Sequence, residues 1–167
     1  LQRALGYACT GDTGEECLFL LHGSGRNGKS KFLSTIKTLL GPYAKTADMH
    51  SFLHKDRETV RNDLADLVGT RFVCASEVNE HTRLAEGLIK QLTGNDNIKA
   101  RFFFEEYFEF PPTFKLFLAF NHRPRTGYTD DEAFWSRIKE IPFTVFIPEE
   151  ERDHDLGKKL CAELPGI

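Results

Sequence analysis

The fold is decided by the stretch CLFLLHGSGRNGKS, which spans residues 17–30. An apolar run leads into a glycine-rich turn that ends in Lys29 and Ser30, and an amphipathic pattern follows. This order of strand, loop and helix matches G-x-x-x-x-G-K-S/T in the context that the motif requires. The sequence therefore predicts a phosphate-binding loop at this point of the chain.

The residue types of this loop suit an anionic ligand. Glycines let the backbone approach a phosphate closely, and the loop N–H groups and the positive end of the helix dipole point at it. We expect Lys29 to reach the β and γ phosphates and the Ser30 hydroxyl to ligate Mg²⁺. The flanking strand and helix disfavour the alternative, a flexible turn with an exposed lysine. The expected nucleotide-binding residues are Gly23, Ser24, Gly25, Arg26, Asn27, Gly28, Lys29 and Ser30.

The composition is that of one soluble globular domain, with 167 residues, 40% hydrophobic and 28% charged. The longest apolar runs have the length of strands and no signal peptide is recognisable, so we expect a cytoplasmic protein without a membrane partner. The net charge of −3 lacks the basic excess of a domain that grips DNA over a broad face. Any nucleic-acid contact must therefore be local.

Four cysteines are scattered along the chain without a C-x-x-C pair, which argues against a zinc site or a disulfide framework. We expect all four to be reduced and buried. The chain starts at Leu1, inside an apolar pattern and without an initiator Met, which indicates a piece of a larger protein. Residues 1–12 are interpreted as the end of a preceding helical segment and a linker.

Apolar periodicity predicts the order of the elements. Helices are expected over residues 1–9, 30–40, 56–68, 82–92, 130–137 and 156–164. Strands are expected over 17–22, 72–75, 114–120 and 141–147, with a short one within 43–48 and a hairpin over 98–110. Alternating apolar strands and helices predict a parallel sheet that binds ligands at the carboxyl ends of its strands. Polar groups follow three such ends, at 23–30, 76–77 and 121.

The order of motifs resembles the ATPase core of superfamily 3 helicases, in particular the helicase part of phage and plasmid primase-helicases, which is similar to the poxvirus primase-helicase. The resemblance covers nearly the whole chain. It implies an α/β P-loop NTPase fold of the AAA+ type, with a central mostly parallel sheet flanked by helices and an inserted β-hairpin, and it implies ATP and Mg²⁺ as cofactors. The segments that carry it are GSGRNGKS, RFVCASEVNE, LIKQLTGNDNIKAR, FKLFLAFNHRP and DEAFWSRIKEIPF.

The resemblance implies a role for Glu77 at the end of the second strand. This carboxylate matches the acid that helps to hold Mg²⁺ through water and positions the attacking water. Many relatives carry two adjacent acids there, whereas this chain has Ser76 before Glu77. Whether Glu77 serves the metal, the water or both is left open, with Glu80 as a candidate helper.

Two further polar residues acquire roles from the resemblance. Asn121 matches the residue that senses the γ phosphate and orients the attacking water. Arg137 looks like the arginine finger that reaches into the neighbouring subunit's site, a role in which an arginine contributes about 10³-fold to 10⁵-fold in rate. Arg123 and Arg125 compete for this role, and a surface salt bridge is the alternative for all three.

The predicted hairpin aligns with the DNA-contacting hairpin that lines the channel of a hexameric ring in the family. Lys99 and Arg101, two apart on a strand, share a face and are expected to follow a phosphate backbone. Relatives place basic residues nearer the tip, whereas this chain has Glu105 and Glu106 there. Rings on which bases would stack, or which pack inward instead, are Phe103, Phe104 and Tyr107.

These features favour an ATP-driven motor that forms hexameric rings and pulls single-stranded DNA through the channel. Residues 13–167 would form the helicase core, with a primase domain upstream and a winged-helix DNA-binding part downstream in the parent chain of a phage, prophage or plasmid. A nucleotide-dependent DNA-binding or assembly module with little turnover is the alternative that Ser76 keeps open. A P-loop phosphotransferase is disfavoured by the Asn121 motif and by the lack of an evident acceptor lid.

Overall fold

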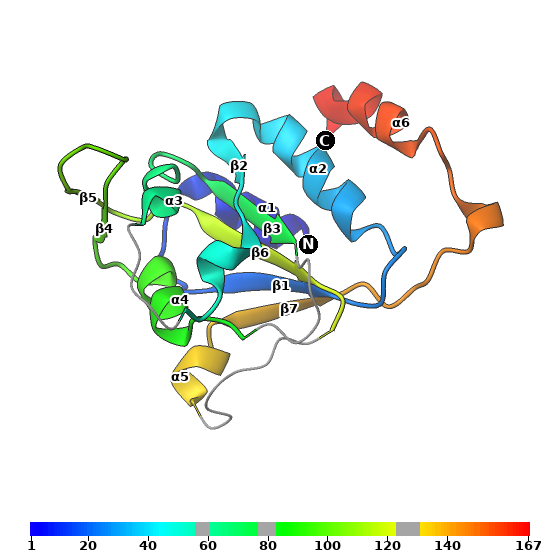
Figure 1. Cartoon of the computed structure of the whole chain (residues 1–167). Helices are drawn as coiled ribbons and strands as arrows, with labels where there is room; N and C mark the ends of the chain where they lie inside the picture. Colours follow the sequence, from blue (N-terminus) through cyan, green and yellow to red (C-terminus); the bar gives the residue numbers. More distant parts are fainter. Residues whose placement is uncertain (56–60, 77–82, 123–130) are drawn as a thin grey trace.

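The strand β1 (Leu18–His22) lies between two parallel neighbours, β6 (Lys115–Phe120) and β7 (Ile138–Pro142). The computed structural model describes residues 1–55, 61–76, 83–122 and 131–167. Within them, β3 (Phe72–Ser76) and β2 (Ala44–Thr46) complete a five-stranded sheet in the order β2-β3-β6-β1-β7, with every pairing parallel (Figure 1). The predicted α/β class with a parallel sheet is confirmed.

Helices cover both faces of this sheet (Figure 1). One face carries α1 (Gln2–Thr10) and α2 (Lys29–Leu40), and α6 (Leu156–Glu163) packs on the outside of α2. The other face carries α3 (Asn62–Ala65), α4 (Glu86–Thr93) and α5 (Glu132–Trp135). Four 3₁₀ turns lie among the described residues: Gly41–Tyr43, Met49–Phe52, Glu149–Glu151 and Leu164–Gly166.

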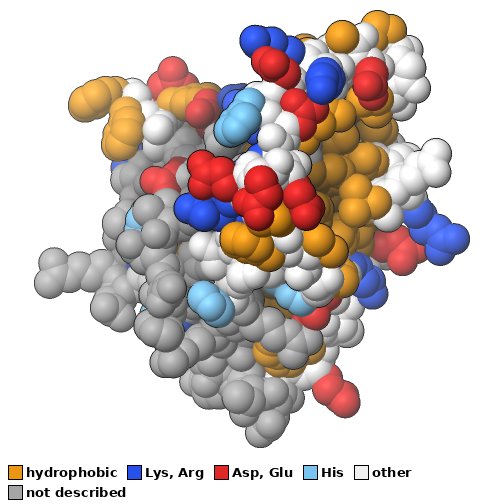
Figure 2. All heavy atoms as spheres, turned by 90° about the vertical axis from the view of Figure 1, so that its right-hand side faces the viewer, with side chains coloured by type: hydrophobic (Ala, Val, Ile, Leu, Met, Phe, Trp, Pro, Cys, Tyr) orange, Lys and Arg blue, Asp and Glu red, His pale blue; other side chains and the backbone are white. Residues whose placement is uncertain are grey.

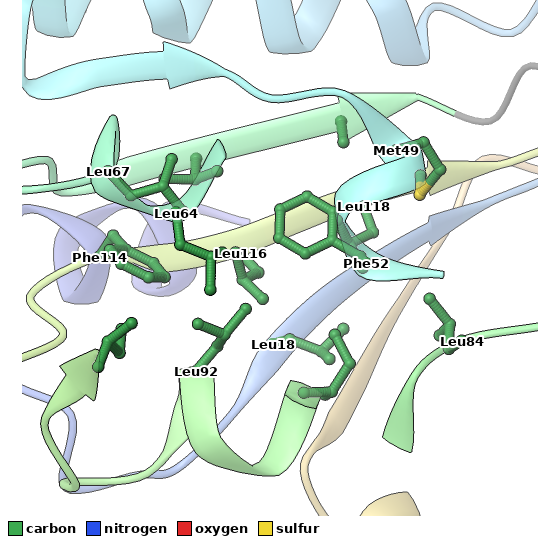
Figure 3. Close-up of a cluster of buried hydrophobic side chains, with 14 of the residues drawn as sticks. Leu18, Met49, Phe52, Leu64, Leu67, Leu84, Leu92, Phe114, Leu116 and Leu118 are labelled. Atoms are coloured by element: carbon green, nitrogen blue, oxygen red, sulfur yellow. The ribbon is translucent and has the colours of Figure 1, made fainter. Parts of the chain in front are cut away.

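The two faces bury alternate residues of each strand, as the pleat of a sheet requires. Leu18 and Leu20 of β1 pack against α3, α4 and α5, whereas Phe19 and Leu21 pack towards α1 and α2. Figure 3 shows the first of these clusters, in which Phe52 and several leucines lie over the central strands. All of β6 is buried, as expected for a strand covered on both faces.

The predicted hairpin is confirmed: β4 (Ile98–Ala100) pairs antiparallel with β5 (Phe108–Phe110). It precedes β6 in the chain and projects beyond the amino ends of the central strands, at the left of Figure 1. Residues 101–107 join its strands, and Phe104 takes a left-handed φ of 66° near the tip. The hairpin and the loop after β1 therefore lie at opposite ends of the sheet.

The last strand differs from its prediction over residues 141–147. It begins at Ile138, because its ladder with β1 already pairs Leu18 with Ile138. Lys139 and Glu140 are exposed on this edge strand, so no continuous apolar run marks its start. Residues 143–147, which were expected to be strand, lie beyond β7, where Phe143 N donates to His22 O at the end of β1 and Ile147 N donates to Arg26 O in the loop.

Three predicted helices are shorter in the described residues, and the one expected over 130–137 is α-helical over Glu132–Trp135. Among the described residues 61–68 of the helix predicted over 56–68, Asn62–Ala65 is α-helical, and the chain then turns towards Gly69, whose φ is 72°. The helix predicted from Thr82 begins at Glu86, since Leu84 forms an antiparallel bridge with Leu53. For the helix that begins at Glu86, this contact with another segment overrides helical periodicity.

The four cysteines are free. Cys17 and Cys74 are buried, as predicted, but the expectation was wrong for Cys9 and Cys161, which lie on exposed sides of α1 and α6. A helix that is both long and apolar enough to cross a membrane is absent from the described residues.

Candidate nucleotide-binding site

The loop between β1 and α2 has a backbone that requires glycine at two positions. Gly23 has a φ of 147°, and Gly28, the residue before α2, has a φ of 90°. A Cβ on Gly23 would lie 2.0 Å from the carbonyl oxygen of Phe143. Residues with side chains rarely adopt such conformations, so these glycines allow the tight turn into α2.

Lys29 is buried in this loop, with 7% of its surface exposed. Its ammonium donates to the carbonyl of Gly23 and to Asn27 Oδ1, at 3.1 Å for the latter. The alternative of an exposed lysine on a flexible turn is therefore wrong. A compact cation held over the loop backbone is suited to an incoming phosphate.

Strand register brings other predicted site residues to the same edge of the sheet. The β1–β6 ladder pairs His22 with Phe120, so Gly23 and Asn121 each follow a paired residue. The next ladder pairs Ser76, the exposed end of β3, with Ala119. The loop, Asn121 and the carboxyl end of β3 therefore meet at one edge, as parallel topology requires. Glu77 and Glu80 lie outside the described residues.

Ser30 is exposed in the first turn of α2, where its hydroxyl would suit Mg²⁺ bound to a nucleotide phosphate. Within the described parts of the chain, no three His, Cys, Asp or Glu side chains gather to hold a metal ion. The role of Ser30 as a Mg²⁺ ligand stays a prediction.

Arg137 lies at the opposite end of the sheet from this loop. Its carbonyl accepts from Leu18 N at the amino end of β1, at 2.9 Å. Its guanidinium donates to Glu16 Oε2 at 2.5 Å and to Ala133 O at 2.8 Å, with 19% of the side chain exposed. The structure therefore does not bring Arg137 to the loop of its own chain. Arg123 and Arg125 lie outside the described residues.

The hairpin places its basic residues as the sequence predicts. Lys99 Nζ lies 5.1 Å and Arg101 Cζ 4.6 Å from the centroid of the Tyr107 ring, so the three share one face. Phe103 and Phe104 are 64% and 107% exposed as whole residues. They do not pack into the core of this chain.

The face that carries the loop has a different character. Figure 2 views the molecule from this side, and on its described part acidic side chains gather near the centre beside hydrophobic ones. The described part of this face therefore shows no broad basic surface.

A second buried lysine lies away from the loop, at the amino end of β6. Lys115 is 2% exposed, and its Nζ lies 4.5 Å from the centroid of the Tyr7 ring without a hydrogen-bond partner among the described residues. Burial lowers the pKa of this amine. Lys115 therefore belongs to the packing of α1 on the sheet.

Comparison with known proteins adds a family to this geometry. The sequence profile of a family of unknown function, DUF5906, matches residues 21–137, which include the loop and Asn121. This chain belongs to the DUF5906 family. The DUF5906 chain is also 35% identical over 153 residues to "Putative helicase L207/L206" of Acanthamoeba polyphaga mimivirus, covering 90% of the chain and 16% of that protein.

Solved structures share the fold of this DUF5906 chain. Two apo structures of the NrS-1 C-terminal region superpose with TM-scores of 0.71 and 0.72 at 11% and 12% identity. The match covers 99% of the DUF5906 chain and 40% of each NrS-1 chain. The chain thus spans less than half of each of these relatives.

The contacts made by Asn27 and by residues 143–147 were not anticipated from sequence. Asn27 was assigned to the loop, but its side chain also bonds to the chain beyond β7. Those partners are backbone carbonyls and amides, which carry no residue-type signal. The one sequence feature that indicates such contacts is an Asn among the loop glycines, because an amide can donate and accept at once.

Proposed function

We propose that this chain is the ATPase core of a DNA helicase from a phage or plasmid replication primase-helicase. The observation that carries the proposal is the loop between β1 and α2, with its left-handed glycines and the buried ammonium of Lys29. A helix N-terminus preceded by such a loop is a general phosphate-binding arrangement. The mimivirus relative, named a putative helicase, supports the choice of activity.

In this proposal the residues at the carboxyl edge share the work of hydrolysis. Lys29 would hold the β and γ phosphates, and Ser30 and Glu77 would hold Mg²⁺. The metal, when bound, neutralises charge that develops on the phosphate oxygens. Glu77 also positions the attacking water, and Asn121 contacts the γ phosphate and orients that water. Because phosphoryl transfer needs mainly positioning and charge stabilisation, we expect this set to support slow hydrolysis.

Full activity would require a second subunit in a hexameric ring. Arg137 lies at the far end of the sheet from its own loop, which suits an arginine that is supplied to a neighbour's site. To act there, its guanidinium would exchange Glu16 for the γ phosphate of the adjoining subunit. Hydrolysis at subunit interfaces would then be coupled to movement along DNA.

The hairpin is the proposed contact with single-stranded DNA. Lys99, Arg101 and Tyr107 form one face that combines two cations with a ring. Phosphates would bind the cations, and bases would stack on the exposed rings of Phe103 and Phe104. Six copies in a ring would concentrate this small basic face in the channel while the outer surface stays acidic.

The proposal is tested by measuring ATP hydrolysis with and without single-stranded DNA. Hydrolysis that DNA stimulates supports the motor. Nucleotide binding without turnover would instead indicate a DNA-binding or assembly module, and phosphate transfer to a small acceptor would indicate a phosphotransferase.

An upstream primase domain in the parent chain is a further expectation, and sequencing of the complete gene would test it.

A further inference from the structure

The side chain of Asn27 connects three parts of the molecule. Its Nδ2 donates to Ser24 O at 2.5 Å, within the loop, and to Phe143 O at 2.8 Å, just beyond β7. Its Oδ1 accepts from Lys29 Nζ at 3.1 Å. An amide can donate and accept at once, whereas a carboxylate only accepts and an alanine does neither. This position therefore uses a chemical property specific to an amide.

Residues 143–147, which we name the clasp segment, run along the loop beyond β7. Phe143 N donates to His22 O at 2.8 Å, and Ile147 N donates to Arg26 O at 3.0 Å. With the Asn27 bond, the clasp segment is thus attached at its first residue to His22 and Asn27 and at its last residue to Arg26. The shape of the loop and the position of the clasp segment are therefore mutually dependent.

The clasp segment leads to the end of the chain that packs on α2. Arg152 Nε donates to Ile147 O at 3.0 Å, and α6 then returns to lie beside α2 (Figure 1). The helix α2 itself begins at Lys29. The chain after β7 therefore contacts both the loop and the helix that would bear a bound phosphate.

We propose that Asn27 is a positioning residue that couples nucleotide occupancy of the loop to the stability of the clasp segment. This inference rests on the proposed nucleotide site. A phosphate stabilises the loop conformation that it binds, and Asn27 joins that conformation to Phe143 and Lys29. Coupling between two sites is reciprocal. If ordering of the clasp segment raises the affinity for nucleotide by some factor, nucleotide binding shifts the equilibrium towards the ordered clasp segment by the same factor.

Hydrogen exchange measured at the backbone amides of Phe143 and Ile147 tests this coupling. In the wild-type protein, saturation with a non-hydrolysable ATP analogue and Mg²⁺ should slow exchange at both amides by about fivefold or more. In Asn27→Ala, both amides should exchange faster without nucleotide and should not slow at saturation. Asn27→Asp should behave like Asn27→Ala at the clasp segment, since a carboxylate cannot donate to Phe143 O.

A matched control is Asn95→Ala, because the Asn95 side chain accepts from Thr13 Oγ1 at 2.6 Å, away from the loop. It should keep the wild-type response. Wild-type protein that binds the analogue without slowing exchange, or Asn27→Ala protein that still slows, would overturn the coupling. Failure of the wild type to bind the analogue would overturn the nucleotide site itself. Equal nucleotide-free rates in wild type and Asn27→Ala would separately show that Asn27 does not hold the clasp segment.

Discussion

The carbonyl oxygen of Phe143 lies 2.0 Å from the position that a Cβ on Gly23 would take, so the chain after β7 closes against the first residue of the loop. Gly23→Ala must therefore displace backbone, not a flexible side chain. Because Gly23 also has a φ of 147°, the substitution should lower the free energy of unfolding by about 1–3 kcal/mol. Urea unfolding measures this loss.

The control for that substitution is Gly25→Ala in the same loop. A Cβ on Gly25 meets open space, so its unfolding midpoint should stay close to that of the wild type. Equal midpoints for the Gly23→Ala protein and the wild type would show that the two segments do not close against each other in solution.

Replacement of the buried amine of Lys115 should stabilise the protein. Lys115→Met removes a buried donor that has no hydrogen-bond partner among the described residues, at the expense of its contact with Tyr7. We expect the free energy of unfolding at pH 7 to rise by about 1 kcal/mol. The exposed Lys139→Met on β7 should change it little.

The gain from Lys115→Met should depend on pH in a defined direction. Burial lowers the pKa of Lys115, so between its folded and unfolded pKa values the unfolded chain binds more protons. Wild-type stability therefore rises with pH through that window, up to an unfolded pKa of about 10.4. The advantage of the variant should shrink as pH rises from 7 towards 10. A Lys115→Met protein that is less stable at pH 7 would show that the Tyr7 contact dominates.

The two roles open to Arg137 can be separated with its partner Glu16. If the arginine is only structural, Arg137→Ala and Glu16→Ala should lose similar stability, at most about 1 kcal/mol for a partly exposed pair, and similar ATPase activity. If it acts on a neighbour's nucleotide, only Arg137→Ala should lose hydrolysis, by about 10³-fold. Mixing Arg137→Ala with Glu77→Ala protein should then restore part of the rate. Absence of rescue at every mixing ratio would count against action across an interface.

The hairpin face should govern affinity for single-stranded DNA. Lys99→Ala combined with Arg101→Ala should weaken binding and reduce the slope of log K against log salt by about 1.4, as expected for two phosphate contacts. ATP hydrolysis without DNA should be unchanged. The matched control is Lys158→Ala with Lys159→Ala on exposed α6, which removes the same charge elsewhere.

The exposed ring at the hairpin tip offers a second, charge-free test. Phe104→Ala should leave the unfolding midpoint unchanged, since the side chain is fully exposed, and should weaken DNA binding by about tenfold through lost stacking. Unchanged affinity in this variant and in the Lys99/Arg101 double variant would remove the hairpin from the DNA site.

Strong local patterns predicted much of the fold. The apolar run before Gly23 forms β1 as expected, and α2 ends before Gly41 as expected. The two β-prone runs of the hairpin form β4 and β5. Each of these patterns is formed by residues close together in the sequence, and the order of the elements that they predict implies a parallel sheet. The meeting of the loop with Asn121 at one edge follows from the same topology.

Other features depend on partners distant in the chain and were not predictable. The start of β7 is set by its ladder with β1, although Lys139 and Glu140 interrupt any apolar run. The pairing of Arg137 with Glu16 joins positions 121 residues apart. The roles proposed for Glu77 and Arg137 derive from resemblance and stay predictions.

The central claim is that the loop ahead of Lys29 binds the phosphates of ATP, and titration of the protein with ATP and Mg²⁺ tests it most directly. Wild-type protein should bind saturably, and Lys29→Ala should weaken binding by about tenfold to a hundredfold through loss of a charge-assisted hydrogen bond. Lys37→Ala, an exposed lysine on the same helix, should bind like the wild type. Equal binding by wild-type and Lys29→Ala protein, or binding by neither, would contradict the account.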